Sequence, residues 1–493
     1  MTGFDITKLG ELNPWWIDKK KILNDINIIN FNKSLFKWIP NLKYYLKLDN
    51  DVIYTIRGPR QIGKTTLIKN IIREILLEKN IKPENVFFWS CERNNADELN
   101  EILQTYFDWR INNKNERKYI FLDEISSIID WHKEILHFYN KGDLINCSIV
   151  LSGSHSIDIK KSTEFLPGRR GSLDSPVDKI LLPMKFSEYV FLLKPELKNK
   201  FSELNFLKNE DKIKTFFDLF NGIINQNLNN LLLYKKEFDN LLESYLLTGG
   251  IPKVINEYNS KEKISLNIYN IYITSILGDL NKYGYKEVFF KQAVSEIIKN
   301  LSNPISWNNI TKNTEIRSHN TAQEYATALE DLYIANLVYK ISLHDKKAQI
   351  SMKKIYINDP FIFHSLDGWT KNKKDYFINS KENIFNSEIR GKIVEGLVYN
   401  HLTRLSYKLN PKDLFDPKDS IFYYKDDKNK EIDFILLYDD QFYPIEVKYQ
   451  NTINESDFVC FKSFKKGVVI TKNDFGLYRN YVKIPLTIFL MLI

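Results

Sequence analysis

The sequence has little cysteine and no long apolar run. Its three cysteines, Cys91, Cys147 and Cys460, lie far apart and form no C-x-x-C pair, which argues against a disulfide framework and a zinc knuckle. No apolar stretch approaches the ~20 residues of a membrane-spanning helix, and the N-terminus lacks the basic and apolar regions of a signal peptide. We therefore expect a protein of the reducing cytoplasm that does not enter a membrane.

The composition describes a large folded chain. With 493 residues, 43% of them hydrophobic, the chain should hold about three domains. The formal net charge of +8 is a mild bias on a chain of this length, compatible with a nucleic-acid partner without requiring one. The apolar stretch 484–493 is too short to span a membrane and predicts a closing strand or helix of the last domain.

One stretch carries a phosphate-binding pattern and is preceded by an apolar run, 52–56, that predicts a buried strand. Helical spacing over 65–77 follows it, so strand, loop and helix come in the order that a nucleotide-binding P-loop needs. The pattern is G-x-x-x-x-G-K-[ST], and all nine residues of the stretch are predicted nucleotide contacts: Gly58, Pro59, Arg60, Gln61, Ile62, Gly63, Lys64, Thr65 and Thr66.

The chemistry of this loop predicts a bound nucleotide with Mg²⁺. Gly58 and Gly63 would let successive backbone N–H groups and the helix N-terminus point at the phosphates. Lys64 would reach the β- and γ-phosphates, and the Thr65 hydroxyl would hold Mg²⁺. The alternative interpretation, an ordinary glycine turn before a helix, does not account for the complete motif.

Residues 119–124 supply the partner that a P-loop requires, a hydrophobic strand that ends in two carboxylates. We expect Asp123 to bind Mg²⁺ and Glu124 to orient and deprotonate the attacking water. A further strand, 148–152, is followed by Ser154, which we expect to contact the γ-phosphate or the water, with His155 as the second choice. The alternative for this segment is a polar turn.

An arginine pair follows this region of the chain. Arg169 or Arg170 could stabilise charge on the transferring phosphoryl group, in the same subunit or in a neighbour of a homo-oligomer; a salt bridge independent of phosphate is the alternative. Further strands are predicted at 85–91 and 177–182. The alternation of strands and helices predicts a parallel sheet covered by helices on both faces.

The middle of the chain has helical patterns. We expect residues 191–300 to form a helical insertion and lid, broken at 249–252. Two short helices, 307–313 and 318–332, with Ser306 and Ser318 as N-caps, precede two strands, 338–343 and 348–357, which together resemble a winged helix. The second helix carries Glu324, Glu330 and Asp331 and no Lys or Arg, so a structural or interdomain role is favoured over base reading by His319, Asn320 and Gln323.

The last part of the chain has a second chemical pattern. Asp433 lies in a predicted strand, 431–438, and Glu446 and Lys448 lie on one face of another, 444–449. This is the D…E-x-K arrangement of metal-dependent nucleases, in which Asp433 and Glu446 would chelate a metal ion and Lys448 would position or activate water. Glu395, on a predicted helix, could complete the metal shell. The alternative is a nuclease-like fold without activity.

The motifs together resemble one prokaryotic family, the archaeal-type AAA+ ATPases with a C-terminal restriction-endonuclease-like, PD-(D/E)xK domain. The resemblance runs in collinear order from about residue 13 to the end. Two departures are the longer segment 191–239 and the acidic helix 318–332. The motifs that carry it are residues 58–65, 121–125, 151–154, 168–170, 186–189, 249–252, 354–360, 431–434 and 445–448.

The resemblance implies ATP as cofactor and an α/β protein with five parts. These are an N-terminal lead-in segment (1–45) whose adjacent tryptophans, Trp15 and Trp16, strap over the next domain, a P-loop AAA+ core (46–190), a helical insertion and lid (191–300), a winged-helix-like domain (301–358) and a nuclease-like domain (359–493).

For function, we expect an ATP-hydrolysing protein that couples its nucleotide state to a C-terminal domain acting on or binding DNA. The alternative is a nucleotide-dependent switch or scaffold with an inactive nuclease-like domain. A transporter-type or metabolic P-loop enzyme is disfavoured, because no motif for a further substrate pocket is visible.

Overall fold

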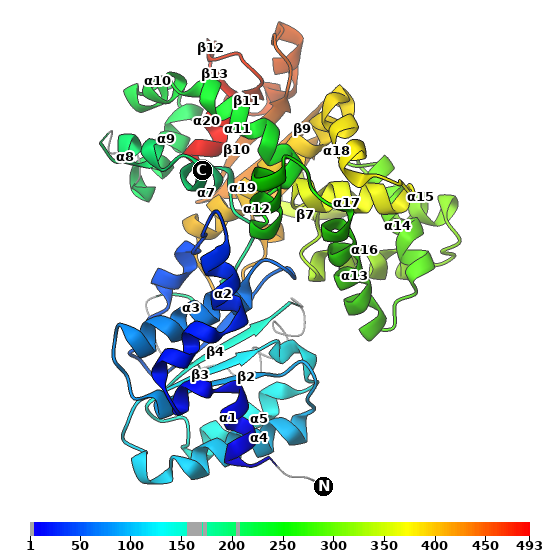
Figure 1. Ribbon diagram of the computed structural model, residues 1–493. Coiled ribbons are helices and arrows are strands. Elements are labelled where there is room, and N and C mark those ends of the chain that lie inside the picture. The colour runs from blue at the N-terminus through cyan, green and yellow to red at the C-terminus, as the bar shows by residue number, and fades with distance from the viewer. Residues whose placement is uncertain (1–3, 155–169, 171–174, 204–207) are drawn as a thin grey trace. The chain divides into compact units, whose positions relative to one another are not determined.

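The computed structural model describes residues 4–154, 170, 175–203 and 208–493 (Figure 1). The chain divides into two compact units. The first holds Met1–Leu182 together with Lys412–Leu414, and the second holds Pro183–Pro411 together with Phe415–Ile493. Apart from Lys412–Leu414, the predicted parts 191–300, 301–358 and 359–493 thus share one compact unit.

The first unit is built on a five-stranded sheet in the order β2-β3-β4-β1-β5, in which every strand pair is parallel. This agrees with the predicted parallel sheet, because β1 to β4 are largely apolar runs that helices or loops separate from one another. Its strands are β1 (Val52–Arg57), β2 (Val86–Ser90), β3 (Lys118–Asp123), β4 (Cys147–Gly153) and β5 (Asp178–Ile180).

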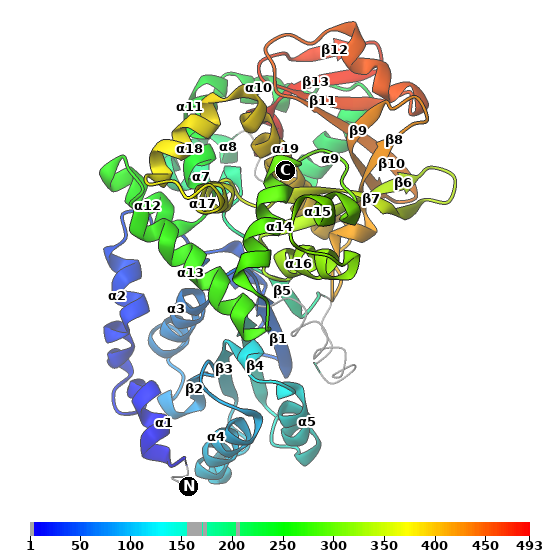
Figure 2. The same ribbon diagram turned by 90° about the vertical axis from the view of Figure 1, so that its right-hand side faces the viewer.

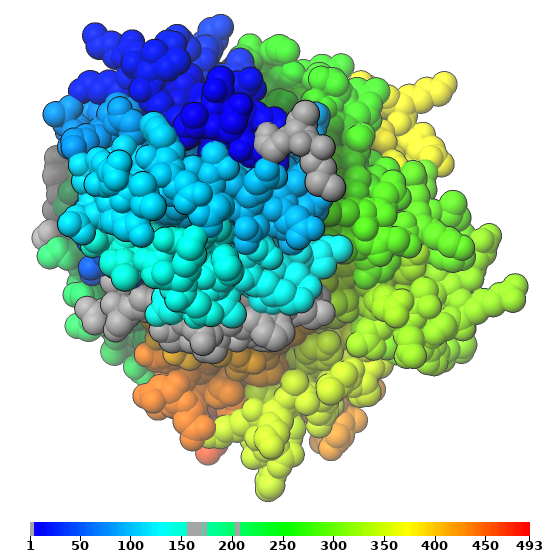
Figure 3. All heavy atoms as spheres, turned by 90° about the horizontal axis from the view of Figure 1, so that it is seen from below, coloured from blue at the N-terminus to red at the C-terminus, as the bar shows by residue number. Residues whose placement is uncertain are grey.

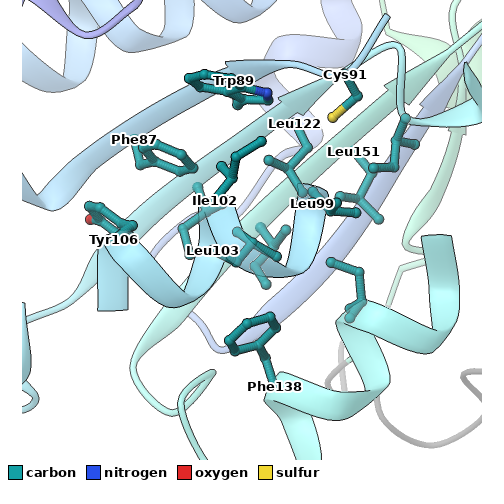
Figure 4. Close-up of a cluster of buried hydrophobic side chains, with 14 of the residues drawn as sticks. Phe87, Trp89, Cys91, Leu99, Ile102, Leu103, Tyr106, Leu122, Phe138 and Leu151 are labelled. Carbon is teal, nitrogen blue, oxygen red and sulfur yellow. The ribbon is translucent and has the colours of Figure 1, made fainter. Parts of the chain in front are cut away.

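Helices cover both faces of this sheet. On one face, α4 (Ala96–Trp109) and α5 (Trp131–Lys141) direct buried side chains such as Leu103 and Phe138 onto β2, β3 and β4 (Figure 4). On the other face, α3 (Lys64–Leu77) packs its apolar stripe against β1, β3 and β4. The carboxyl end of β1 leads through a short loop into α3, and this edge is where such sheets bind ligands.

The N-terminal segment lies on the surface of the same unit (dark blue in Figure 3). It contains α1 (Ile6–Leu12), the short turn Pro14–Trp16 and α2 (Ile26–Lys33). Trp15 is fully buried, and the indole N–H groups of Trp15 and Trp16 donate to the Val86 carbonyl at 2.9 and 3.0 Å. The two tryptophans therefore fasten the segment to the sheet, as the sequence predicted.

The second unit is mainly helical. Its helices are α7 (Phe186–Leu193), α8 (Pro195–Glu203), α9 (Asn209–Phe220), α10 (Gln226–Leu232), α11 (Lys235–Thr248), α12 (Pro252–Lys261), α13 (Leu266–Lys282), α14 (Glu287–Lys299), α15 (Trp307–Asn313), α16 (His319–Asp331), α17 (Pro360–Thr370), α18 (Tyr376–Phe385), α19 (Ser387–Leu409) and α20 (Leu486–Leu492). Every residue of α20 is buried, and α7, α9 and α11 pack against it. The helices predicted as a lid thus also complete the hydrophobic core of this unit.

The second unit also holds an eight-stranded mixed sheet in the order β12-β13-β11-β10-β9-β8-β6-β7 (Figure 2). Its strands are β6 (Ala335–Ser342), β7 (Lys347–Ile357), β8 (Ile421–Lys425), β9 (Glu431–Tyr438), β10 (Gln441–Lys448), β11 (Gly467–Thr471), β12 (Gly476–Tyr478) and β13 (Tyr481–Pro485).

The predicted wing differs from an isolated two-stranded wing. Its helices and its antiparallel β6–β7 hairpin are present, but β6 also pairs in parallel with β8 at Lys340 and Tyr423. The physical reason is that Leu337, Val338 and Ile341 of β6 are buried and need neighbours. The hairpin is therefore an extension of the C-terminal sheet.

Within the described residues, no helix is both long enough and apolar enough to span a bilayer.

Candidate nucleotide site and acidic cluster

The P-loop connects β1 to α3, as the sequence predicted. Gly63 has φ 97° and lies at the N-cap of α3, where no side chain accepts a hydrogen bond from the helix. The first N–H groups of α3 thus face the loop without a side-chain cap, as in helix-terminal anion sites. Gly58 is required for space, because a Cβ there would lie 2.1 Å from the Leu181 carbonyl oxygen.

The Lys64 side chain folds back over the loop. Its Nζ donates to the carbonyl oxygens of Gly58 at 2.9 Å and Pro59 at 3.1 Å, and it lies 3.7 Å from Glu124 Oε1. The side chain is buried. The ammonium group can therefore exchange loop carbonyls for phosphate oxygens with little movement of its stem.

Thr65 and Asp123, the two predicted Mg²⁺ ligands, lie together at the end of β3. Thr65 Oγ1 donates to Asp123 Oδ2 at 2.6 Å. Burial raises the pKa of Asp123, while hydrogen bonds from Ser152 and Thr65 oppose that rise. A hydroxyl and a carboxylate in contact are the donor pair that a P-loop uses for Mg²⁺, so these residues fit the ion.

Ser152 is a residue that the sequence analysis did not assign to the site. Its hydroxyl donates to Asp123 Oδ1 and accepts the backbone N–H of Glu124 at 3.2 Å. The parallel register that pairs Leu122 with Leu151 brings it beside Asp123. That register was the signal that could have identified Ser152, since both strands end in polar residues at the same edge.

Glu124 has the geometry of a base beside the loop. Its φ of 52° is unusual for a residue other than glycine, and Ser154 Oγ donates to its Oε2 at 3.2 Å. Burial alone would raise the pKa of Glu124, but Lys64, Arg60 and Ser154 outweigh burial and lower it. The carboxylate is thus ionised at neutral pH and able to accept a proton.

The other predicted contacts have different positions. Arg60 lies 3.7 Å from Glu92, and Ile62 is buried in the core beneath the loop, so only the backbone of Ile62 could face phosphate. Gln61 has φ 61°, a left-handed conformation inside the loop. His155 and Arg169 lie outside the described residues.

For Arg170, the structure favours the alternative of a phosphate-independent role over stabilisation of phosphoryl charge. Its guanidinium donates to the Ile53 carbonyl at 3.2 Å and to Thr55 Oγ1 at 2.9 Å, and its side chain is buried against β1. These bonds satisfy buried polar groups of the sheet. Arg170 therefore supports the strand that leads into the P-loop.

A buried ion pair beneath the loop was also missed by the sequence analysis. Arg57, the residue before Gly58, lies 2.8 Å from Asp178 of β5, and Thr55 Oγ1 donates to the same carboxylate at 2.9 Å. The Asp178 backbone N–H donates to Asp413 at 2.8 Å, and the Leu414 N–H donates to the Asp178 carboxylate at 3.1 Å. Lys412–Leu414 therefore packs beside β5 in the first unit through its hydrogen bonds with Asp178.

The second predicted constellation comes together in the sheet of the second unit. The backbone N–H of Asp433 donates to Glu446 Oε2 at 3.1 Å, and that of Val447 donates to Asp433 Oδ2 at 3.0 Å. Lys448 Nζ lies 2.7 Å from Glu446 Oε1. The D…E-x-K residues are thus neighbours, as their strand positions predicted.

Glu395 of α19 belongs to the same cluster electrostatically. Burial, followed by the negative charge of Asp433, raises the pKa of Glu395, and the same two causes raise the pKa of Glu446. Among the residues that the structure describes, Glu395 Oε2 is buried without a hydrogen-bond partner. A carboxyl group in this position favours its protonated form.

Lys354 of β7 is the residue that the sequence analysis missed in this cluster. Its side chain is 1% exposed, and its Nζ lies 2.5 Å from Glu431 and 3.0 Å from Asp433. A buried lysine usually has to be paired, and here both partners are carboxylates.

The residues of this cluster do not fit a metal ion. Over the described part of the chain, no group of three or more His, Cys, Asp and Glu side chains is arranged to hold one. Both oxygens of Asp433 and both of Glu446 already accept from protein N–H or ammonium groups. The nuclease roles predicted for Asp433, Glu446, Lys448 and Glu395 therefore have no support from metal geometry.

Comparison with protein families supports the first site. Residues 50–190 match a family described as an AAA domain. Residues 239–373 and 390–489 match two families that are each described as a domain of unknown function, DUF8612 and DUF4143. No curated protein has significant similarity to the chain. Residues 50–190, most of which belong to the first unit, thus form an AAA-type P-loop ATPase domain.

Three solved structures with detectable similarity come from archaea. The Walker-type ATPase of Pyrococcus abyssi is 14% identical, with 74% of this chain and 98% of that chain covered and a TM-score of 0.38. The Aeropyrum pernix Orc1 protein in complex with DNA is 12% identical, with 66% of this chain and 88% of that chain covered and a TM-score of 0.30. Cdc6p from Pyrobaculum aerophilum is 14% identical, with 70% of this chain and 97% of that chain covered and a TM-score of 0.26. Similarity at this level carries no argument about activity or partners.

Proposed function

We propose that the protein binds ATP with Mg²⁺, hydrolyses it, and uses its nucleotide state to control a C-terminal domain that acts on or binds DNA. One observation is the main support for ATP hydrolysis. Two separate segments of the chain bring their polar groups into contact at one edge of the sheet, and these groups belong to Lys64, Thr65, Asp123 and Glu124. The match to an AAA domain supports the same proposal.

Each residue of the nucleotide site would have a separate role in ATP hydrolysis. The loop N–H groups and Lys64 would bind and orient the phosphates, and Thr65 and Asp123 would hold Mg²⁺, which supplies positive charge to the phosphate oxygens. Glu124, ionised and held by Ser154, would take the proton of the attacking water. Ser154 lies beside this carboxylate, where a polar group can sense the γ-phosphate.

The central experiment measures ATP binding and steady-state ATP hydrolysis. We expect Lys64→Ala to abolish tight binding and Glu124→Gln to keep binding but to slow hydrolysis by about 100-fold or more. Glu78 and Lys79 are exposed residues just after α3. The variants Glu78→Gln and Lys79→Ala are therefore matched controls, which should leave ATP binding and ATP hydrolysis unchanged. Hydrolysis that persists in Lys64→Ala would contradict the proposal.

We also propose that Arg169 takes part in ATP hydrolysis. Charge on the transferring phosphoryl group would be stabilised by this arginine within one subunit or across a homo-oligomer. The test is the specific ATPase activity as a function of protein concentration. An activity that rises with concentration and falls in Arg169→Ala supports action across subunits.

The proposed action on DNA is tested by the effect of DNA on ATP hydrolysis. ATPase activity is measured with and without single- and double-stranded DNA, for wild type and Asp433→Ala. DNA stimulation that Asp433→Ala removes would link the acidic cluster to the P-loop. If DNA neither binds nor stimulates the ATPase, the proposed action on DNA is refuted, whereas the proposed ATP hydrolysis is unaffected.

A second candidate function is a nucleotide-dependent switch or scaffold whose C-terminal domain does not cleave DNA. The specific observation that favours it is Lys354, whose ammonium group lies between carboxylates that a nuclease would need for metal. DNA incubated with Mg²⁺ or Mn²⁺, with and without ATP, separates the candidates. Cleavage that Lys448→Ala and Asp433→Ala both abolish would exclude the scaffold.

A further inference from the structure

Lys354 is set into the acidic cluster by the fold of the second unit. It lies near the end of β7, on the side where α19 packs across both β7 and β9. Its ammonium group contacts Glu431 and Asp433, which lie on one face of β9. Such a position is costly for a charged side chain unless the opposite charges remain beside it.

The hydrogen bonds of the cluster leave little room for another cation. Asp433 Oδ1 accepts from Lys354, and Oδ2 accepts from the Val447 N–H. Glu446 pairs with Lys448 through Oε1 and accepts the Asp433 N–H through Oε2. A divalent ion would require at least one of these donors to leave, because Mg²⁺ needs carboxylate oxygens at about 2.0–2.1 Å.

We infer that the Lys354 ammonium group permanently occupies the cation position of this cluster, so that the C-terminal domain needs no divalent metal for its structure or its binding function. The two lysines, Lys354 and Lys448, face Asp433, Glu446 and Glu431, and Lys425 lies 3.8 Å from Glu431 at the margin. The protein itself thus supplies the positive charge that a metal-dependent nuclease takes from solution. This inference goes beyond the proposed function and does not depend on ATP hydrolysis.

Removal of Lys354 should convert the cluster into a metal site. Without the ammonium group, Asp433 and Glu431 would lie side by side on β9 without their shared cation, and such carboxylates bind hard divalent cations. Lys425→Ala is the matched control, because it removes a lysine that lies 3.8 Å from Glu431 at the margin of the cluster.

The experiment is a Mn²⁺ titration of the full-length, nucleotide-free protein, followed by electron paramagnetic resonance of free Mn²⁺. We expect wild type, Asp433→Asn and Lys425→Ala to bind the same number of ions. Lys354→Ala should bind one more ion, and the double variant Lys354→Ala/Asp433→Asn should lose it. A wild type that binds one ion more than Asp433→Asn would overturn the inference.

Two further outcomes are informative. A folded Lys354→Ala protein that gains no ion would also overturn the inference, since its ammonium group would then not be filling a cation position. If Lys354→Ala does not fold, the comparison of wild type with Asp433→Asn still decides the question. An inactive P-loop would appear only in the ATPase assay, so the two proposals fail separately.

Discussion

At the scale of single residues, the nucleotide site depends on a hydroxyl that the P-loop motifs do not include. Ser152 links the Asp123 carboxylate to the Glu124 backbone, so one side chain positions both acidic residues. Ser154 holds the Glu124 carboxylate from the other side. The two serines make the edge of β4 part of the site.

We predict that Ser152→Ala lowers the ATPase kcat by about tenfold with a smaller effect on ATP affinity. The loss corresponds to about one hydrogen bond to a charged group, and it acts on the orientation of Asp123 and Glu124 more than on phosphate contacts. Ser148→Ala, in the same strand but bonded to the Leu48 and Asn50 carbonyls, is the control for stability. An unchanged kcat in Ser152→Ala would refute this positioning role.

A second residue-scale prediction concerns Asp359, the N-cap of α17. Burial raises its pKa to about 6, although N–H groups of Gly250, Phe361 and Ile362 oppose the rise. The folded protein therefore binds this proton more tightly than the unfolded chain, and Asp359 favours folding at low pH. Its contribution should be lost as pH rises from about 4 to about 6, lowering the free energy of unfolding by roughly 2–3 kcal/mol.

Urea unfolding of wild type and Asp359→Asn across this pH range checks the sign. The difference in unfolding free energy, wild type minus variant, should fall as pH rises. Asp375 caps α18 in a similar way, but its pKa is lowered, chiefly because the Ile378 N–H donates to it. Asp375→Asn should therefore show no such fall, and a parallel fall in both variants would contradict the assignment.

At the scale of elements, the helix break between α11 and α12 depends on the backbone of Gly249. Its φ is 56° and ψ is −157°, and a Cβ there would lie 1.9 Å from Asp359 Oδ1. The Gly250 N–H donates to the same carboxylate at 2.7 Å. The break and the start of α17 are thus held by one carboxyl group.

We predict that Gly249→Ala lowers the free energy of unfolding of this unit by more than about 2 kcal/mol, because the methyl group would displace Asp359. Gly278, inside α13, has open space where a methyl group would lie. Gly278→Ala should instead stabilise the unit by about 0.5–1 kcal/mol, through helix propensity alone. Urea unfolding of the two variants measures both signs, and equal effects would exclude this explanation.

Local patterns predicted most of these elements. The strands β1 to β4 are continuous apolar runs, α3 follows the loop glycine, and Ser306 and Ser318 cap α15 and α16 as expected. The D…E-x-K residues were also predicted as neighbours, because strand alternation places Glu446 and Lys448 on one face.

Contacts between distant segments could not be predicted in the same way. Lys354 and Asp433 are 79 positions apart, and their contact depends on how β7 and β9 are arranged around α19. The register of β3 against β4 decides that Ser152 contacts Asp123, and the burial of β6 decides that the wing joins a larger sheet. Each of these depends on tertiary packing, which sequence periodicity does not encode.

At the scale of the whole molecule, the chain passes between its two units more than once. It leaves the first unit after Leu182, and Lys412–Leu414 returns to it before Phe415 continues the second. The returning segment contacts Asp178, which pairs with Arg57 next to the P-loop. The first unit is therefore completed by a segment that lies between α19 and β8 in the chain.

We predict that Asp413→Ala makes the thermal unfolding of the two units less cooperative. The variant removes the acceptor of the Asp178 N–H, which weakens the attachment of the returning segment by about 1 kcal/mol. Differential scanning calorimetry should show a broader or split transition, whereas Asp427→Ala, in an exposed turn, should not. A single transition identical to wild type would rule out this role of Asp413.

The returning segment also limits how this protein can be divided. A fragment that ends at Leu182 would contain every P-loop motif and still lack the three residues that pack beside β5. We therefore expect such a fragment to be less stable than the same residues in the full chain, and a gene for a transferable ATPase domain would have to encode residues 412–414 as well.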